Sequence, residues 1–189
     1  MVSTSLVYSE LEAGLTEVAR SPRERGSLAM LVRRPQRGER EVLEVGALDV
    51  EQGLIGDRWA LGKRRRVDQL TLINVRLLAL IAPTRERWPL AGDQLYVDFD
   101  LSAEHLPPGT RVGIGAAEIE VSAEPHLGCR LFRERYGEDA LRLVNSPGGQ
   151  ALRLRGINAW VVKSGTVRIG DDVRALFGSD GLEPARYRP

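Results

Sequence analysis

The chain has 189 residues, 42% of them hydrophobic, which is long enough for one well-buried domain. Its 27 Lys and Arg residues against 26 Asp and Glu residues leave a formal net charge of +1, so no broad basic field indicates a nucleic-acid partner. The start of the chain lacks a signal-peptide pattern, the longest apolar run (residues 77–82) is too short to cross a membrane, and the single cysteine excludes an internal disulfide framework. We therefore expect a cytoplasmic protein with neither nucleic acid nor membrane as a partner.

The first part of the chain predicts one helix followed by strands. Apolar residues recur at helical spacing over residues 8–20, and residues 21–26 break that pattern. From there onward the sequence is typical of short strands separated by glycines. Strands are expected at residues 28–33 and 41–48, with a turn at residues 35–40 between them.

The middle of the chain carries the clearest β pattern. A glycine-punctuated loop at residues 53–59 leads to a strand at residues 69–74 and a helix at residues 75–82, which Pro83 ends. Residues 95–99 then alternate between apolar and polar types, as a half-buried strand does. The remaining predicted elements are a hairpin of residues 111–114 and 118–121 around Gly115-Ala116, a helix at 137–145, and a hairpin of residues 157–162 and 166–169.

Many short strands with only a few helices indicate the fold class. They favour a mainly β, β-barrel-rich fold with a few short helices over any βαβ arrangement. We expect residues 1–27 to form an N-terminal helix and linker, residues 28–176 the barrel domain, and residues 177–189 a loose C-terminal tail.

Cys129 is the first candidate for chemistry. It lies between a strand-like and a helix-like segment, where a helix start and the nearby Arg130 and Arg133 would stabilise a thiolate. Such a thiolate can attack, carry a sulfur atom or ligate a soft metal. The alternative is a buried cysteine that acts as a small hydrophobic residue.

A second candidate is the glycine loop that precedes a basic run. Gly56, Asp57 and Arg58 are followed by Lys63, Arg64, Arg65 and Arg66. Arginine side chains match phosphate bidentately, and glycines let backbone N–H groups approach an anion closely. The alternative is a solvated basic loop, which is the usual explanation of a charge run.

Two further positions are open to more than one interpretation. Arg155 and Gly156 could place a guanidinium at the mouth of a pocket or simply form a strand edge. His126, three residues before Cys129, suggests a metal site, but one Cys and two His are too few for a closed zinc site. His105 lies in a loop that we expect to be structural. A single cysteine ligand to a metal carried by an organic cofactor remains open.

Other enzyme classes lack their required motifs. The sequence contains no Walker-type loop, no Gly-x-Ser-x-Gly elbow and no HExxH motif. Gly113-Ile114-Gly115 belongs to a hairpin and not to a dinucleotide-binding loop, because no helix follows it. Asp171-Asp172 after Gly170 is typical of a turn and not of a catalytic carboxylate pair.

Taken together, the motifs resemble the MOSC family, the domain found at the C-terminus of molybdenum-cofactor sulfurases and in stand-alone bacterial proteins. The resemblance covers residues 28–176. Its pieces, in chain order, are residues 53–58, 69–73, 91–95, 100–102, 108–115, 125–129 and 154–157 and the Gly-Asp at 170–171. Trp59 stands where relatives have a polar residue or His, and Gln94 where Asn is usual, so both positions alter the shape of the pocket.

The resemblance implies a β-barrel-rich fold that binds molybdenum cofactor, a molybdopterin carrying the metal. It makes Cys129 the catalytic group, as molybdenum ligand or sulfur carrier, and assigns Gly56, Asp57, Arg58 and Arg155 to the cofactor pocket. The further candidates for cofactor binding are Arg64, Arg65, Arg66, His126 and Gly156. We expect Arg58 and Arg155 to share one pocket with Cys129, and residues 63–66 to form a mobile cationic lip.

Three functions remain open at this stage. The protein could be a molybdenum-dependent oxidoreductase that acts on a small substrate, such as an N-hydroxylated compound. It could be a sulfur transferase or carrier that receives sulfur on Cys129 from a separate pyridoxal-phosphate-dependent desulfurase, since the chain is too short to contain that domain. It could also be a cofactor-binding module without chemistry of its own. The substrate, the partner and the oligomeric state do not follow from the sequence.

Overall fold

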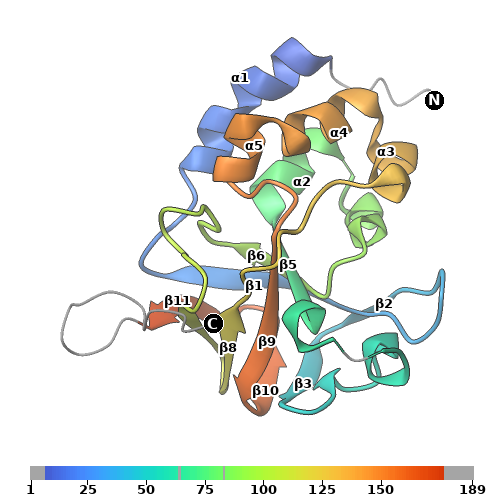
Figure 1. The fold of residues 1–189 in the computed structure, drawn as a ribbon, viewed down its shortest axis with the longest axis vertical. Helices are drawn as coiled ribbons and strands as arrows, with labels where there is room; N and C mark the ends of the chain where they lie inside the picture. The colour runs from blue at the N-terminus through green and yellow to red at the C-terminus, as the bar shows by residue number, and fades with distance from the viewer. Residues whose placement is uncertain (1–6, 64, 83, 177–189) are drawn as a thin grey trace.

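The fold is a closed β-barrel with helices packed over one end of it (Figure 1). The structure is a computed structural model that describes residues 7–63, 65–82 and 84–176. Within these residues seven strands form the barrel in the order β11-β7-β8-β9-β5-β6-β1, and β11 pairs with β1 to close it. The prediction of a mainly β, barrel-rich fold with a few short helices is confirmed. The barrel strands are β1 (Gly26–Arg33), β5 (Leu70–Asn74), β6 (Leu95–Asp98), β7 (Arg111–Ile114), β8 (Ala117–Val121), β9 (Ile157–Lys163) and β11 (Asp172–Leu176).

Three short strands form a second sheet below the barrel, and here two predictions were wrong. Residues 41–48 are not one strand, because β2 (Glu41–Leu43) pairs with β1 while β3 (Val45–Asp49) pairs with β10 (Gly165–Arg168). The predicted hairpin of residues 157–162 and 166–169 has the right strands and the wrong partners. The strand β10 pairs with β3, which also pairs with β4 (Gly53–Leu54), whereas β9 lies between β8 and β5.

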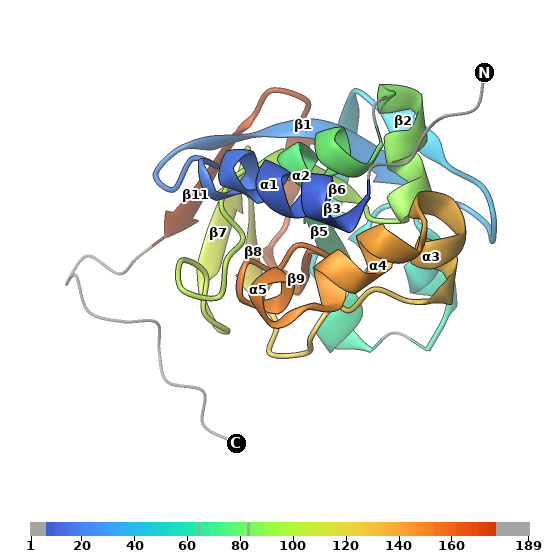
Figure 2. The same cartoon turned by 90° about the horizontal axis from the view of Figure 1, so that it is seen from above.

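The helices lie on the other side of the molecule from the second sheet (Figures 1 and 2). No described helix is long and apolar enough to span a membrane. The predicted helices at residues 8–20, 75–82 and 137–145 are present within a residue of their expected bounds. The helices are α1 (Tyr8–Ala19), α2 (Val75–Ile81), α3 (Arg130–Tyr136), α4 (Glu138–Asn145) and α5 (Pro147–Ala151), with 3-10 turns η1 (Arg58–Leu61), η2 (Arg66–Asp68) and η3 (Arg85–Ala91).

Two hydrophobic clusters explain why some strands are apolar on both faces. On β6, Leu95 and Val97 point into the barrel, while Tyr96 points outward and packs under the helices with Phe132 and Tyr136. Leu95, Tyr96 and Val97 are all fully buried. The simple alternation expected for residues 95–99 therefore describes which cluster each side chain joins, and not whether it is exposed.

Two connecting segments meet above the barrel and carry the candidate site. Residues 122–129 join β8 to α3, and residues 152–156 join α5 to β9. Arg153 (φ 47°) and Gly156 (φ 105°) bend the second segment, and a side chain at 156 would clash with the Leu72 carbonyl oxygen. Because of this bend, Arg155 is turned into the protein, where only 8% of its side chain is exposed.

Candidate functional site

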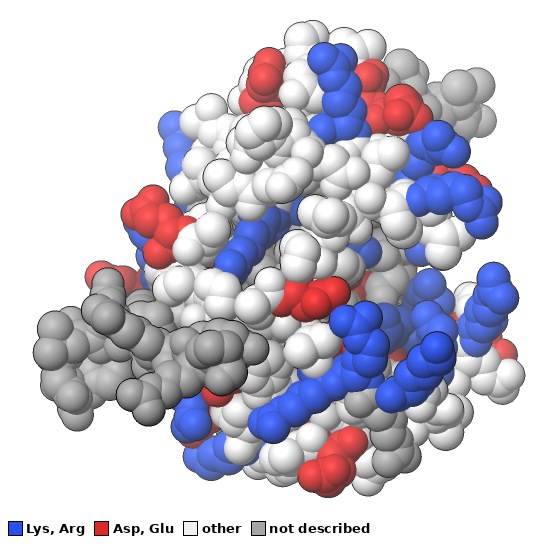
Figure 3. Space-filling view, in the orientation of Figure 1, with Lys and Arg blue, Asp and Glu red and all other residues white. Residues whose placement is uncertain are grey.

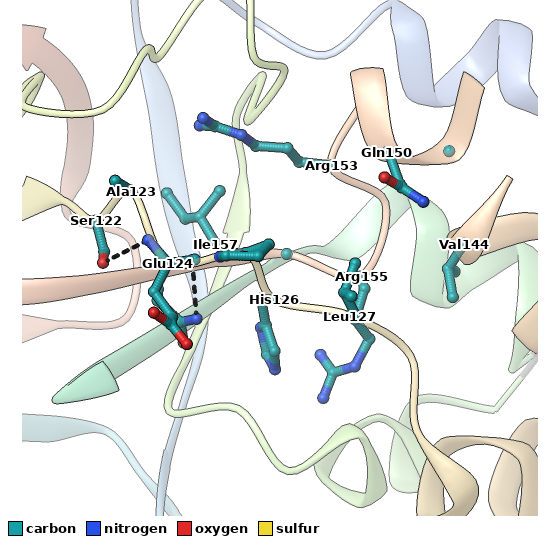
Figure 4. A pocket seen from close by; sticks show the side chains of 14 residues that line it. Ser122, Ala123, Glu124, His126, Leu127, Val144, Gln150, Arg153, Arg155 and Ile157 are labelled. Atoms are coloured by element: carbon teal, nitrogen blue, oxygen red, sulfur yellow. Dashed lines mark hydrogen bonds between the residues drawn. The ribbon is translucent and has the colours of Figure 1, made fainter. Parts of the chain in front are cut away.

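Two adjoining hollows lie where the connecting segments meet. The first, here called the enclosed cavity, has a volume of about 150 Å³ and is lined by residues that include His126, Leu127, Arg153 and Arg155 (Figure 4). The second, the cationic cleft, is wider, at about 550 Å³. Glu124, Pro125, His126 and Asn158 line both hollows, so they share one wall.

The cationic cleft is lined on its outer side by Arg34, Arg58, Lys63 and Arg65. Lys and Arg side chains gather over this part of the surface in Figure 3. Arg65 forms ion pairs with Glu124 (3.2 Å) and Asp68 (3.7 Å), whereas within the described residues Arg58 and Lys63 have no ion-pair partner. The cleft therefore has positive charge that an anionic ligand could neutralise.

Asp57 is buried behind the wall of the cleft and holds Arg34 and the start of η1 in place. Its carboxylate is fully buried and accepts hydrogen bonds from Arg34 Nε (2.9 Å) and Nη2 (2.9 Å) and from the backbone N–H of Arg34 and Trp59. Burial alone would raise the pKa of Asp57, but these bonds and the Arg34 charge outweigh it and lower the pKa. Asp57 caps η1 and thereby sets the position of Arg58.

A second buried ion pair joins the connecting segment of residues 152–156 to the residues that precede β6. Arg155 Nη1 lies 2.8 Å from Asp93 Oδ2 and 3.2 Å from Oδ1, and its Nη2 donates to the Ala91 carbonyl oxygen. Burial opposes the charge on Asp93, but Arg155 and His126 lower its pKa on balance, so the carboxylate is ionised. Arg155 Nε is buried without a hydrogen-bond partner, and so is the hydroxyl of Tyr96.

His126 adjoins this ion pair and faces both hollows. Its Nδ1 lies 3.6 Å from Asp93 Oδ1 and is buried without a hydrogen-bond partner. Burial and the nearby Arg155 charge lower the pKa of His126 to about 4, even though Asp93 acts in the opposite direction. The imidazole is therefore neutral at pH 7. In Figure 4 the side chains of His126 and Arg155 point the same way, and Arg153 points away from both.

Cys129 lies at the edge of this region and not within it. The thiol is exposed, which rules out the alternative of a buried packing residue. It precedes α3 directly, while its neighbours Arg130 and Arg133 form ion pairs with Glu134 and Glu138. Cys129 lines neither the enclosed cavity nor the cationic cleft, although Leu127, two residues earlier, lines the cavity.

The other candidate residues fall into three groups. Gly56 (φ 80°) turns the chain before η1, and Gly156 allows the close approach to β5 described above. Arg66 lies over the ring of Trp160, at 5.3 Å from its centroid, and not in the cleft. Arg64 lies outside the described residues. Arg58 and Arg155 line different hollows that meet at His126, and neither hollow includes Cys129.

Two residues of the site were not predicted from the sequence. Asp93 is part of a family motif without a role of its own, and Arg34 belongs to no motif. A charged residue two positions before a strand, as Asp93 is before β6, could have suggested a buried role. Its partner Arg155 is 62 positions away, and no pattern in a single sequence connects them.

The described part of the chain contains no group of three or more His, Cys, Asp or Glu side chains placed to hold a metal ion. The fold and site together define a closed β-barrel protein with a cationic cleft beside a buried Asp–Arg–His cluster. Residues 84–174 match the MOSC domain family, which confirms the resemblance drawn from the sequence.

Solved structures show the same fold at low sequence identity. The YuaD protein from Bacillus subtilis is similar with a TM-score of 0.60 and 18% identity, over 80% of this chain and 96% of that chain. YiiM from Escherichia coli is similar with a TM-score of 0.55 and 19% identity, over 81% and 70%. YiiM from Geobacillus stearothermophilus gives a TM-score of 0.53 and 12% identity, over 83% and 78%. A comparison with curated proteins gives no match.

Proposed function

We propose that this protein binds molybdenum cofactor, with the anionic phosphate of the pterin in the cationic cleft. The match of residues 84–174 to the MOSC domain family suggests the cofactor, and the unpaired charges of Arg58 and Lys63 are the observation that carries the proposal. The cleft volume of about 550 Å³ lies within the range of roughly 300–1,000 Å³ that is usual for small-molecule sites. These residues fit the anionic part of the group, so Arg58, Lys63 and Arg65 would hold it.

In this proposal the cofactor, when bound, supplies a molybdenum centre able to exchange electrons and oxygen or sulfur atoms. The chain itself contributes binding and orientation. Arg34 and Asp57 hold η1 and the outer wall of the cleft in place. The Asp57 carboxylate accepts bonds both from the Arg34 guanidinium and from the backbone N–H of Trp59 in η1, and so ties η1 to Arg34. Cys129, exposed at the start of α3, would be the ligand to the metal or the acceptor of sulfur.

The test is the cofactor content of protein purified from a host that makes molybdenum cofactor. The double variant Arg58→Ala/Lys63→Ala should lose most of its bound pterin and molybdenum, as measured by pterin fluorescence after oxidation and by elemental analysis. Arg20→Ala/Lys163→Ala removes the same charges from two exposed ion pairs elsewhere and should keep its cofactor. Equal cofactor in both variants, or none in the wild-type protein, would contradict the proposal.

A second candidate function is that of a sulfur carrier without redox chemistry. It is favoured by the exposure of Cys129 between two exposed leucines, Leu127 (49%) and Leu131 (44%), where a protein donor could reach the thiol. The Cys129 thiolate would attack the terminal sulfur of a persulfide on a pyridoxal-phosphate-dependent desulfurase. A new S–S bond forms on Cys129, and the cysteine thiolate of the desulfurase leaves.

The two functions differ in what they predict for Cys129. Incubation with a cysteine desulfurase and free cysteine should add one sulfur atom to the Cys129 peptide if the protein is a carrier, which mass spectrometry detects. Cys129→Ser is the control that cannot gain this sulfur. A cofactor-loaded protein that never acquires the sulfur would favour the molybdenum-dependent function. Either role suits the cytoplasm, where a lone exposed cysteine stays reduced, and we propose residues 28–176 as the unit that carries it.

A further inference from the structure

We infer that His126 exchanges a proton with an oxyanion bound in the cationic cleft, and that Asp93 is the residue that positions its ring. The inference deepens the proposed function and rests on the anion site of that proposal. His126 is suited to this role by its place in the wall between the two hollows. Its ring also lies beside the buried Asp93–Arg155 pair.

The position of Asp93 selects one tautomer of His126. Nδ1 is buried and 3.6 Å from Asp93 Oδ1, a separation that a small ring movement would convert into a hydrogen bond. A carboxylate can only accept, so Nδ1 must carry the proton of the neutral ring. Nε2 then has its lone pair free to accept a proton on the side of the hollows. Arg155 keeps Asp93 ionised and so preserves this arrangement.

The charges around His126 explain why the ring is neutral at pH 7. Arg155, before β9, offsets Asp93, before β6, and Arg34, after β1, is offset by Asp57. Beyond these pairs, the cleft contributes Arg58, Lys63 and Arg65 against Glu124 and Asp68, an excess of one positive charge over this set. A proton on His126 would add to that excess in a buried place, which agrees with the lowered pKa of about 4.

A bound oxyanion reverses this balance. Its negative charge beside Nε2 compensates the cations of the cleft and favours the imidazolium, so binding should raise the pH at which Nε2 takes up a proton from solvent. The imidazolium can then donate that proton to an oxygen of the ligand and return to its neutral form. No bond to carbon, sulfur or metal changes in this exchange. The ligand class that the site fits is therefore an oxyanion that can accept a proton, as the phosphate of the proposed cofactor can.

The test follows the two histidines of the chain by NMR, with sulfate as the probe because it stays fully ionised above pH 4. His126→Gln identifies the His126 signals, and His105, which is buried beside Asp100 and lines neither hollow, provides an internal reference. At pH 7 the nitrogen shifts report which ring nitrogen carries the proton. A pH titration with and without sulfate then reports the midpoint for each histidine.

We expect a neutral His126 protonated on Nδ1, and a midpoint that rises by about one pH unit in sulfate, which corresponds to about tenfold tighter binding to the protonated protein. The His105 signals should not respond to sulfate. The sulfate dissociation constant should tighten by about twofold between pH 7 and pH 5 in the wild-type protein and stay flat in His126→Gln.

Two results would overturn the inference. One is a neutral His126 protonated on Nε2, and the other is a midpoint that sulfate leaves unchanged although sulfate binds. A protein that binds no sulfate would instead contradict the anion cleft of the proposed function, and the tautomer at pH 7 would still decide the role of Asp93. If acid unfolds the protein before the titration is complete, the sulfate dissociation constants from pH 7 to pH 5 show whether sulfate favours the protonated ring of His126.

Discussion

The molecule contains two buried Asp–Arg pairs on either side of its candidate site, and they are built differently. In the first, Asp57 accepts two bonds from the guanidinium of Arg34 and two from backbone N–H groups, so its carboxylate is fully satisfied. In the second, Arg155 approaches both oxygens of Asp93 through one nitrogen, and its Nε has no partner. The first pair is closed, because every bond of its carboxylate is made within the protein. The second pair is open, because Arg155 Nε and the neighbouring His126 Nδ1 have no hydrogen-bond partner.

The difference matters because an incompletely satisfied buried network is costly to keep. The negative charge of Asp93 is compensated mainly by Arg155. Asp57, in contrast, would keep its two backbone N–H donors if the Arg34 side chain were removed. A purely structural role would favour the closed arrangement at both places. The open one at Asp93 is consistent with a site that completes its bonds only when a ligand binds.

The largest expected effect comes from breaking the second pair. Arg155→Met should lower the free energy of unfolding by about 3–5 kcal/mol, because it leaves the Asp93 carboxylate buried and unpaired. Urea unfolding at pH 7 measures the loss. A loss below about 1 kcal/mol, the range of an exposed ion pair, would mean that Asp93 is not held as described.

The pH dependence of stability separates His126 from both aspartates. The unfolded chain binds the His126 proton near pH 6.5 and the folded protein only near its pKa of about 4, so stability should fall by about 3 kcal/mol as the pH drops through this window. Asp57 and Asp93 have lowered pKa values, so they affect stability only at pH values below this window. Urea unfolding from pH 7 to pH 4 should show this fall in the wild-type protein and a flatter profile in His126→Gln.

Breaking the first pair should cost less than breaking the second. Arg34→Met should lower the free energy of unfolding by about 1–3 kcal/mol, since the backbone donors of Arg34 and Trp59 still satisfy part of the Asp57 carboxylate. The same urea experiment gives the comparison directly. If Arg34→Met costs as much as Arg155→Met, the distinction between a closed and an open pair does not hold.

The smallest effect is expected at Cys129, which belongs to neither pair. Cys129→Ser should change the free energy of unfolding by less than about 0.5 kcal/mol, because the thiol is exposed and makes no side-chain capping bond. The same variant should lose any capacity to carry sulfur. A destabilisation of more than about 1 kcal/mol would show that the thiol packs against the protein.

Local elements were largely predictable from the sequence, and their pairing was not. The hairpin of β7 and β8 was predicted because Gly115 marks the turn between two alternating segments. The strand β11 was missed, since its Asp172 looked like part of a turn. Its role depends on pairing with β1 and β7, far away in the sequence, which no local pattern reveals.

The candidate site shows the same division. Arg155 and Gly156 drew attention because an arginine beside a glycine is a recognisable local signal. Asp93 and Arg34 did not, because their importance comes from burial and from partners that only the folded chain brings close. The exposure of Cys129 was also beyond prediction, since either a buried or an open thiol fits its immediate neighbours.

The closure of the barrel by its first and last strands has a consequence for how the chain folds as it is made. The strand β1 leaves the ribosome before every other barrel strand, and β11 leaves it after them. The pairing of Gly26 with Val173 can therefore form only at the end of barrel synthesis. Until then β1 and β7 each present an unpaired edge to other nascent chains. Slow translation over the last barrel strands would therefore lengthen the period in which this protein can aggregate.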